Sequence, residues 1–188
     1  MRFLSLLIIA LATLLQGCAV PVVAAGVGAG LMVSSDRRSA GAMIEDDTIE
    51  TKSSQRISEK YKDTARVSVT SYNRFALLSG EVRTEAARMD IERIVGSVPN
   101  VKGIANELVV GASTGMGTRS NDTFITSSVK ARFVNSTAFK ADHVKVVTES
   151  GVVYLMGLVT RAEADASSDI ASTTRGVQKV VRVFEYID

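Results

Sequence analysis

The sequence predicts an α+β fold made of two tandem α-β-β-α-β units, each a three-stranded mixed sheet packed by two helices. Two observations predict it. The second half of the chain repeats the first at a spacing of about 76 residues, so that Asp46-x-x-Ile49 returns as Asp122-x-x-Ile125. Within each copy, apolar residues at helical spacing give way to two alternating segments, and a second helical stretch then leads into a final alternating one.

The second copy shows the pattern most clearly. Asp122 or Asn121 is predicted to cap a helix that carries Ile125, Val129 and Phe133 on one inward face. The elements expected to follow are a hairpin of residues 144–148 and 152–159 with its turn at 149–151, a helix at 161–174, and a last strand at 177–186. The first copy has Ser53 in the place of Val129. Its first helix is therefore more polar, and we expect it to be less stable or to lean on the second copy.

Gly80 and Gly157 lie at the same position inside the second strand of each copy. A glycine weakens a strand, so its repeated presence indicates either a bulge or the close approach of a helix backbone. We expect both glycines to be structural and any side chain there to destabilise the domain.

The N-terminus is predicted to be a secretory signal peptide. A charge-free, mostly apolar stretch from Phe3 to Leu15 follows Arg2 and precedes a Gly-Cys pair ending at Cys18. The Leu-x-Gly-Cys ending resembles the lipobox of bacterial lipoproteins, in which the cysteine is lipidated and becomes the first mature residue. By the same resemblance, Ala19 in place of aspartate implies the periplasmic face of the outer membrane. The predicted segments are a signal peptide (1–17), a lipidated tether (18–45), the first copy (46–111), a linker (112–120) and the second copy (121–188).

Composition argues against several functions. The net charge is +2 with acids and bases interspersed, and tryptophan is absent, so we expect no nucleic-acid partner. Cys18 is the only cysteine and His143 the only histidine, so we expect no metal and no cofactor; His143 is expected to be an ordinary surface histidine. A Gly-x-Ser-x-Gly pattern at 111–115 lacks the large parallel sheet that a nucleophile elbow needs, and we expect no catalytic residue.

Taken together, these features resemble a pair of BON domains, the small α-β-β-α-β modules of bacterial envelope proteins, as found in dual-BON outer-membrane lipoproteins. The resemblance covers residues 46–188 and is strongest at 121–126 and 153–160. It implies that the second copy binds anionic phospholipid, such as phosphatidylglycerol or cardiolipin. It also implies support of envelope integrity and an association with division sites.

The resemblance places lipid contact on the first helix of the second copy, from residue 122 to about 134. The expected contact residues are Phe124, Ile125, Ser128, Lys130 and Arg132. With the core face turned inward, Phe124 projects beside the two cations, as a headgroup interface requires. The first copy has Thr48, Ser54 and Arg56 at the places of Phe124, Lys130 and Arg132, so only the second copy is expected to bind.

An alternative stays open. A phenylalanine near a helix start is often a staple against its own domain or part of a domain interface. In that case the protein is an interaction scaffold, in which the same surface or the strand edge at 177–186 binds an envelope protein or the sister domain.

Overall fold

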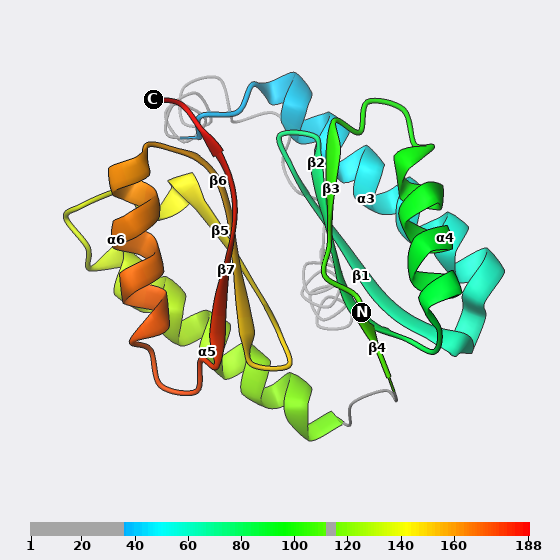
Figure 1. Cartoon of the computed structure of the whole chain (residues 1–188). Coiled ribbons are helices and arrows are strands. Elements are labelled where there is room, and N and C mark those ends of the chain that lie inside the picture. The colour runs from blue at the N-terminus through cyan, green and yellow to red at the C-terminus, as the bar shows by residue number, and fades with distance from the viewer. Residues whose placement is uncertain (1–35, 112–115) are drawn as a thin grey trace, which may run out of the picture. The chain divides into compact units, whose positions relative to one another are not determined.

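The computed structural model describes residues 36–111 and 116–188 (Figure 1). The predicted signal peptide, Cys18 and residues 112–115 of the linker lie outside the described residues. No helix within the two described ranges has the length and apolar character needed to cross a membrane.

Both copies form the predicted order of elements. The first domain contains α3 (Ala40–Tyr61), a 3-10 turn η1 (Lys62–Thr64), β1 (Ala65–Tyr72), β2 (Phe75–Val82), α4 (Glu85–Gly96), β3 (Gly103–Asn106) and β4 (Val109–Val110). The second domain contains α5 (Met116–Val134), η2 (Ala141–His143), β5 (Val144–Glu149), β6 (Val152–Val159), α6 (Arg161–Ser172) and β7 (Lys179–Tyr186).

Each sheet is mixed, as expected. In the second domain the order is β5-β6-β7, with β5 antiparallel and β7 parallel to the central β6. The first domain has the same arrangement, but its third strand is interrupted, so that β3 and β4 both pair in parallel with β2. Between them Leu108 turns into the core of the first domain, 5% exposed. The first sheet therefore has four strand segments where the sequence predicted three.

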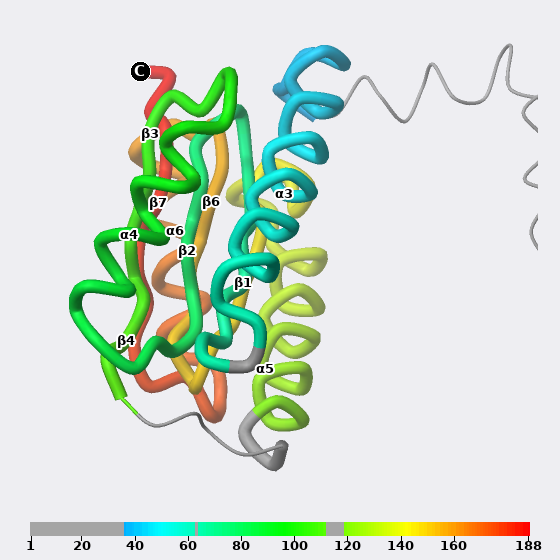
Figure 2. The backbone as a smooth tube through the Cα atoms, turned by 90° about the vertical axis from the view of Figure 1, so that its right-hand side faces the viewer, coloured from blue at the N-terminus to red at the C-terminus, as the bar shows by residue number. Residues whose placement is uncertain are grey.

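The described domains form a sandwich with helices on the two outer faces and the two sheets facing each other (Figures 1 and 2). The central strands β2 and β6 are consequently buried along nearly their whole length. On β6, Val153 and Leu155 pack under the helices of their own domain, whereas Tyr154 and Met156 face the other sheet. The layer between the sheets, called the interdomain layer below, has its buried residues at Tyr72, Leu77, Tyr154, Met156 and Leu158.

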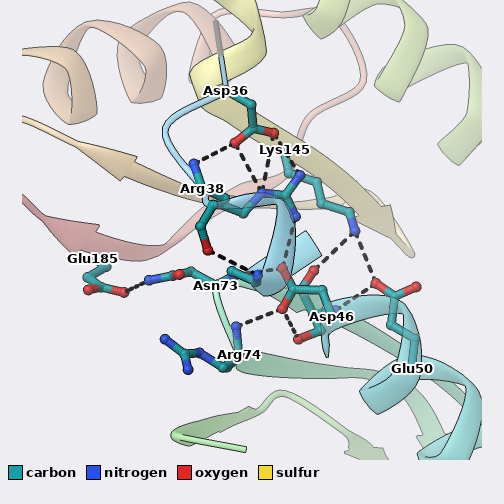
Figure 3. A network of polar contacts seen from close by, with 11 residues as sticks. Asp36, Arg38, Asp46, Glu50, Asn73, Arg74, Lys145 and Glu185 are labelled. Atoms are coloured by element: carbon teal, nitrogen blue, oxygen red, sulfur yellow. Dashed lines mark hydrogen bonds and ion pairs between the residues drawn. The ribbon is translucent and has the colours of Figure 1, made fainter. Parts of the chain in front are cut away.

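An aspartate at the start of each domain holds a hairpin turn. Asp122 accepts hydrogen bonds from the backbone N–H groups of Ser150 and Gly151, both at 2.8 Å. Asp46 accepts from the N–H groups of Asn73 at 2.9 Å and Arg74 at 2.7 Å (Figure 3). Each turn has two residues with positive φ, the geometry of a type I′ hairpin. The prediction that Asp122 caps its own helix is therefore corrected: it lies well inside α5, and its carboxylate binds the turn.

The first helices begin earlier than predicted. α3 starts at Ala40, where the Ser39 hydroxyl accepts a hydrogen bond from the N–H of Ala42 at 3.1 Å. α5 starts at Met116. Residues 40–45 of the predicted tether and 116–120 of the predicted linker are thus helical. Small and polar residues dominate both stretches, so they carry no apolar periodicity to indicate a helix.

The two strand glycines are explained by neighbouring backbone. A Cβ at Gly80, whose φ is +118°, would lie 2.0 Å from the carbonyl oxygen of Arg66 on β1. A Cβ at Gly157 would lie 2.4 Å from the carbonyl oxygen of His143. The close approach comes from the chain at the adjoining strand β1 or just before β5, where the sequence led us to expect a helix or a bulge.

Candidate functional site

α5 is held in place by its inward face. Ile125, Val129 and Phe133 recur every four residues, are at most 1% exposed and pack in the core of the second domain. Phe139 packs edge-on against the ring of Phe133, with ring centroids 5.0 Å apart. The helix cannot rotate without exposing these side chains, so its outward face is fixed.

Phe124 lies on that outward face, and its side chain is 61% exposed. Ser127 and Ala131, one and two turns further on, are also exposed, and both are small. Val134 at the end of the helix is 73% exposed. A benzyl group therefore projects from a helix surface whose near neighbours are too short to cover it.

Lys130 and Arg119 are exposed on one flank of this face. They are eleven residues apart, or three helical turns, which places them on the same side of α5. Neither side chain makes a hydrogen bond or ion pair with any described residue. Arg119 was missed in the sequence because it falls in the stretch assigned to the linker. Only recognition that the helix extends back to residue 116 could have found it.

Arg132, on the other flank, is already engaged. Its guanidinium donates to the carbonyl oxygen of Ile170 at 2.6 Å and to the hydroxyls of Thr173 at 3.0 Å and Thr174 at 2.7 Å. These groups are at the C-terminal end of α6, where unpaired carbonyls attract cations. In the first domain Arg56 likewise reaches Ser97, the C-cap of α4, at 2.9 Å. The arginine ties the two helices of each domain together.

Two further predicted contact residues are placed by the structure. Ile125 is completely buried, and its inclusion among the lipid contacts is corrected, because it cannot reach a ligand without leaving the core. Ser128 is partly exposed, and its hydroxyl donates to the carbonyl oxygen of Phe124 at 2.8 Å. Of the five residues named from the sequence, Phe124 and Lys130 have outward side chains with no competing partner among the described residues.

α3 provides the matched surface in the first domain. At the places of Phe124 and Lys130 it has the exposed polar residues Thr48 and Ser54. α3 contains five acidic and three basic residues, whereas α5 contains three basic residues and one acid, the buried Asp122. The net charge of α3 is therefore negative and that of α5 positive, and only α5 has the exposed Phe124.

His143 is 7% exposed, which corrects the expectation of a surface histidine. Its Nδ1 lies 3.4 Å from Oε1 of Glu163. Within residues 36–111 and 116–188 no group of three or more His, Cys, Asp or Glu side chains is arranged to hold a metal ion.

A groove of about 470 Å³ opens between the outer strands β3 and β7 of the two sheets. Phe75, Ile104, Val181, Val183 and Phe184 supply much of its wall, and Lys102 and Glu185 are among its charged residues. Val181 and Val183 also border the interdomain layer. The groove is thus the open side of that layer.

Comparison with known proteins agrees with this architecture. The BON domain family matches residues 45–112 and 121–188. The outer membrane lipoprotein DolP of Haemophilus influenzae is 36% identical over 176 residues, covering 93% of this chain and 91% of that protein. The 21 kDa hemolysin of Actinobacillus pleuropneumoniae is 35% identical over 154 residues, covering 81% and 79%. The osmotically-inducible protein Y of Escherichia coli is 29% identical over 160 residues, covering 81% and 78%. With two matched domains and relatives similar along most of its length, the chain belongs to the BON domain family and is an outer-membrane lipoprotein of that family.

Proposed function

We propose that the protein is a non-enzymatic, lipid-anchored module that binds anionic phospholipid through the outward face of α5. One observation carries the proposal: Phe124 is 61% exposed on a helix face of small residues, and the unpaired Lys130 and Arg119 lie on its flank. The ring would enter the headgroup boundary while the cations pair with phosphate. Arg132 is a positioning residue in this scheme, since it joins α5 to α6.

The expected affinity of this surface alone is low. Burial of a phenylalanine side chain contributes about 1.5–3 kcal/mol, and each cation near an anionic surface contributes about 1 kcal/mol. These terms correspond to binding at roughly millimolar lipid, which vesicle sedimentation can detect and which an anchor at the membrane would strengthen. We propose that Cys18, in segment 18–45 after a signal peptide at 1–17, provides the anchor. A second attachment then benefits from an effective concentration of order millimolar.

A membrane-anchored protein that binds lipid headgroups is suited to maintaining the outer membrane and envelope integrity. Recruitment to division sites would follow if anionic lipids such as phosphatidylglycerol or cardiolipin gather there. The BON family membership and the similarity to DolP support this role.

Vesicle binding tests the proposal. The mature chain with Cys18→Ser, which has no anchor, should sediment with vesicles containing phosphatidylglycerol and should not sediment with pure phosphatidylcholine. Both domains should be kept, because an isolated second domain would expose Tyr154 and Met156 of the interdomain layer. Phe124→Glu should abolish binding, since it replaces the inserted ring with a like charge to the lipid.

The matched control is Thr48→Glu, which adds the same charge at the equivalent exposed position of α3. It should leave vesicle binding unchanged. Circular dichroism should show both variants folded, because neither position is buried. Equal binding by Phe124→Glu and the parent protein would remove α5 as the lipid site.

A second candidate function is that of a protein-interaction scaffold. The observation that favours it is the groove between β3 and β7 together with the outer edge of β7, which pairs only with β6 among the described strands. An extended segment of another protein would add to this edge by backbone hydrogen bonds. A photo-crosslinker at Lys179, exposed on β7, should then capture a protein in cells, whereas one at Phe124 should capture lipid. Capture of protein only at Phe124 would favour a scaffold built on α5 itself.

A further inference from the structure

Asp36, Arg37 and Arg38, called the strap below, contact both domains just before α3 begins. Arg37 binds the second domain. Its Nη1 donates to Oε2 of Glu163 at 2.6 Å and to the carbonyl oxygen of Leu158 at 2.8 Å, and its Nη2 donates to Oε1 of Glu163 at 2.9 Å.

Arg38 turns to the first domain (Figure 3). Its Nη1 donates to Oδ2 of Asp46 at 2.9 Å, and its guanidinium carbon lies 4.2 Å from the centre of the Tyr72 ring. Asp36 accepts from Nη2 of the same arginine at 2.8 Å and holds it in this orientation. Consecutive residues therefore reach opposite halves of the sandwich.

The strap is attached to the interdomain layer itself. Tyr72, under Arg38, and Leu158, whose carbonyl binds Arg37, are both buried members of that layer. Other polar contacts that join the domains, such as Lys145 with Glu50 at 3.0 Å and Asn73 with Glu185 at 2.7 Å, link one repeated unit directly to the other. The strap differs from them because it lies outside the repeated units, at the end of the N-terminal segment.

The acceptors of the strap are fixed before it binds. Glu163 also accepts from the backbone N–H of Thr160 at 2.9 Å as part of the capping box of α6. Asp46 is held by the N–H groups of the β1–β2 turn. The Arg37 and Arg38 side chains are only 27% and 16% exposed, so solvent screens these contacts less than it screens an ordinary surface ion pair.

We propose that the strap is a latch that holds the two sheets closed on each other, and that its release opens the interdomain layer. The strap lies where the N-terminal segment joins α3, so release of the latch would begin at this junction. Opening would uncover apolar side chains of β2 and β6, among them Leu77, Tyr154 and Met156, and would free the two domains to move independently. This inference does not depend on lipid binding by α5.

Thiol labelling at two positions of β6 tests the latch. In the mature chain with Cys18→Ser, Met156→Cys places a thiol in the interdomain layer, and Val153→Cys places one in the core of the second domain. The thiol at 156 reacts when the sheets part, whereas the thiol at 153 reacts only when the domain unfolds. Leu77→Cys, on the facing sheet, replaces the first reporter if Met156→Cys does not fold.

Arg37→Ala should raise the labelling rate at position 156 about tenfold, as expected for loss of a bidentate, charge-assisted contact. The rate at position 153 should stay well below the rate at position 156, because the core of the second domain is reached only on unfolding. Arg37→Lys, which keeps the charge without the planar fork, should give an intermediate rate. The control Arg56→Ala removes an arginine contact confined to the first domain and should leave the rate at position 156 as it was.

Two results would overturn the proposal. An unchanged rate at position 156 in Arg37→Ala would show that the sheets stay closed without the strap. Equal labelling rates at positions 153 and 156 in Arg37→Ala would show that the interdomain layer is exposed only when the protein unfolds, and that the strap is no latch.

Discussion

α3 and α5 occupy the same place in their domains but present different surfaces. Inward, Ile49 and Ile57 of α3 match Ile125 and Phe133 of α5, and each helix contributes a buried aspartate to a hairpin turn. Outward, α3 has charges of both signs, and α5 is basic with an exposed Phe124. Packing restricts the residues on the inward face of a repeated unit, so the two copies match there. The residues on the solvent-exposed face are not restricted by packing, so the two copies can differ there.

Arg56 and Arg132 show why position alone is a poor guide to function. Both are exposed cations on the first helix, and one of them was predicted to bind lipid. Both instead bind the end of the second helix of their own domain. A group with the same contacts in both copies is explained by the fold, and a group present in one copy only, such as Phe124, requires another explanation.

The largest effect is expected where the two copies are most alike. Gly80→Ala should destabilise the protein by about 3 kcal/mol or more, because the new Cβ meets a carbonyl oxygen at a positive φ. Gly157→Ala should cost less, since only the steric clash with the carbonyl of His143 applies there. Urea unfolding followed by circular dichroism measures both. A Gly80→Ala midpoint at or above that of Gly157→Ala would contradict this ranking.

The turn aspartates come next. Asp46→Ala should lower the free energy of unfolding by about 2–4 kcal/mol, and Asp122→Ala by about 1–3 kcal/mol, because each leaves partly or fully buried turn N–H groups without an acceptor. Asp46 has the larger expected effect since it also binds Ser71 and Arg38. Chemical denaturation gives the energies, and amide exchange at residues 73–74 and 150–151 locates the loss. Unchanged protection of the turn amides in both variants would show that the aspartates do not hold the turns.

Acid should weaken the N-terminal contacts of α6 and not those of α4. Arg37, with the backbone N–H of Thr160 and with His143, lowers the pKa of Glu163 to about 2 from its usual 4.5. A depressed folded-state pKa means that the stabilisation is complete above pH 4.5 and is lost as the pH falls toward 2. α4 has Ala87 at the equivalent position behind its N-cap Thr84.

The measurement is the free energy of unfolding as a function of pH for the parent protein and Glu163→Gln. The difference between them should be present at pH 7 and should shrink steadily below pH 4.5. A difference that does not vary with pH would mean that the charge of Glu163 is irrelevant to the fold.

The smallest effect concerns the polar core of the first domain. Ser53 is completely buried on α3, and its hydroxyl has no hydrogen-bond partner among the described residues; Val129 takes this place in α5. Ser53→Ala should raise the free energy of unfolding by about 1 kcal/mol, because it removes a desolvated hydroxyl and favours the helix. A thermal melt is sufficient to detect this change. A lower melting temperature would show that the hydroxyl is satisfied.

Much of each domain was predictable because its signals are local. The spacing of Ile125, Val129 and Phe133 predicted both the helix and its buried face, and alternating residues around 149–151 predicted the hairpin. Because the unit is repeated, each element was predicted independently from two stretches of sequence. The start of α5 was missed because glycine, serine and threonine before Asp122 carry no periodic signal, and Arg119 was missed with it.

The sequence by itself determined the α-β-β-α-β order of each unit, the outward place of Phe124 and the repeated glycines, because these follow from periodicities within a few turns of chain. Only the tertiary structure decided that Asp122 binds a turn, that Arg132 binds α6, and that Arg37 and Arg38 span two facing sheets. Each of these last contacts joins residues far apart in the chain or in different domains. Local pattern fixes which face of an element is apolar, but the partner of a polar side chain is settled only when the distant segments meet.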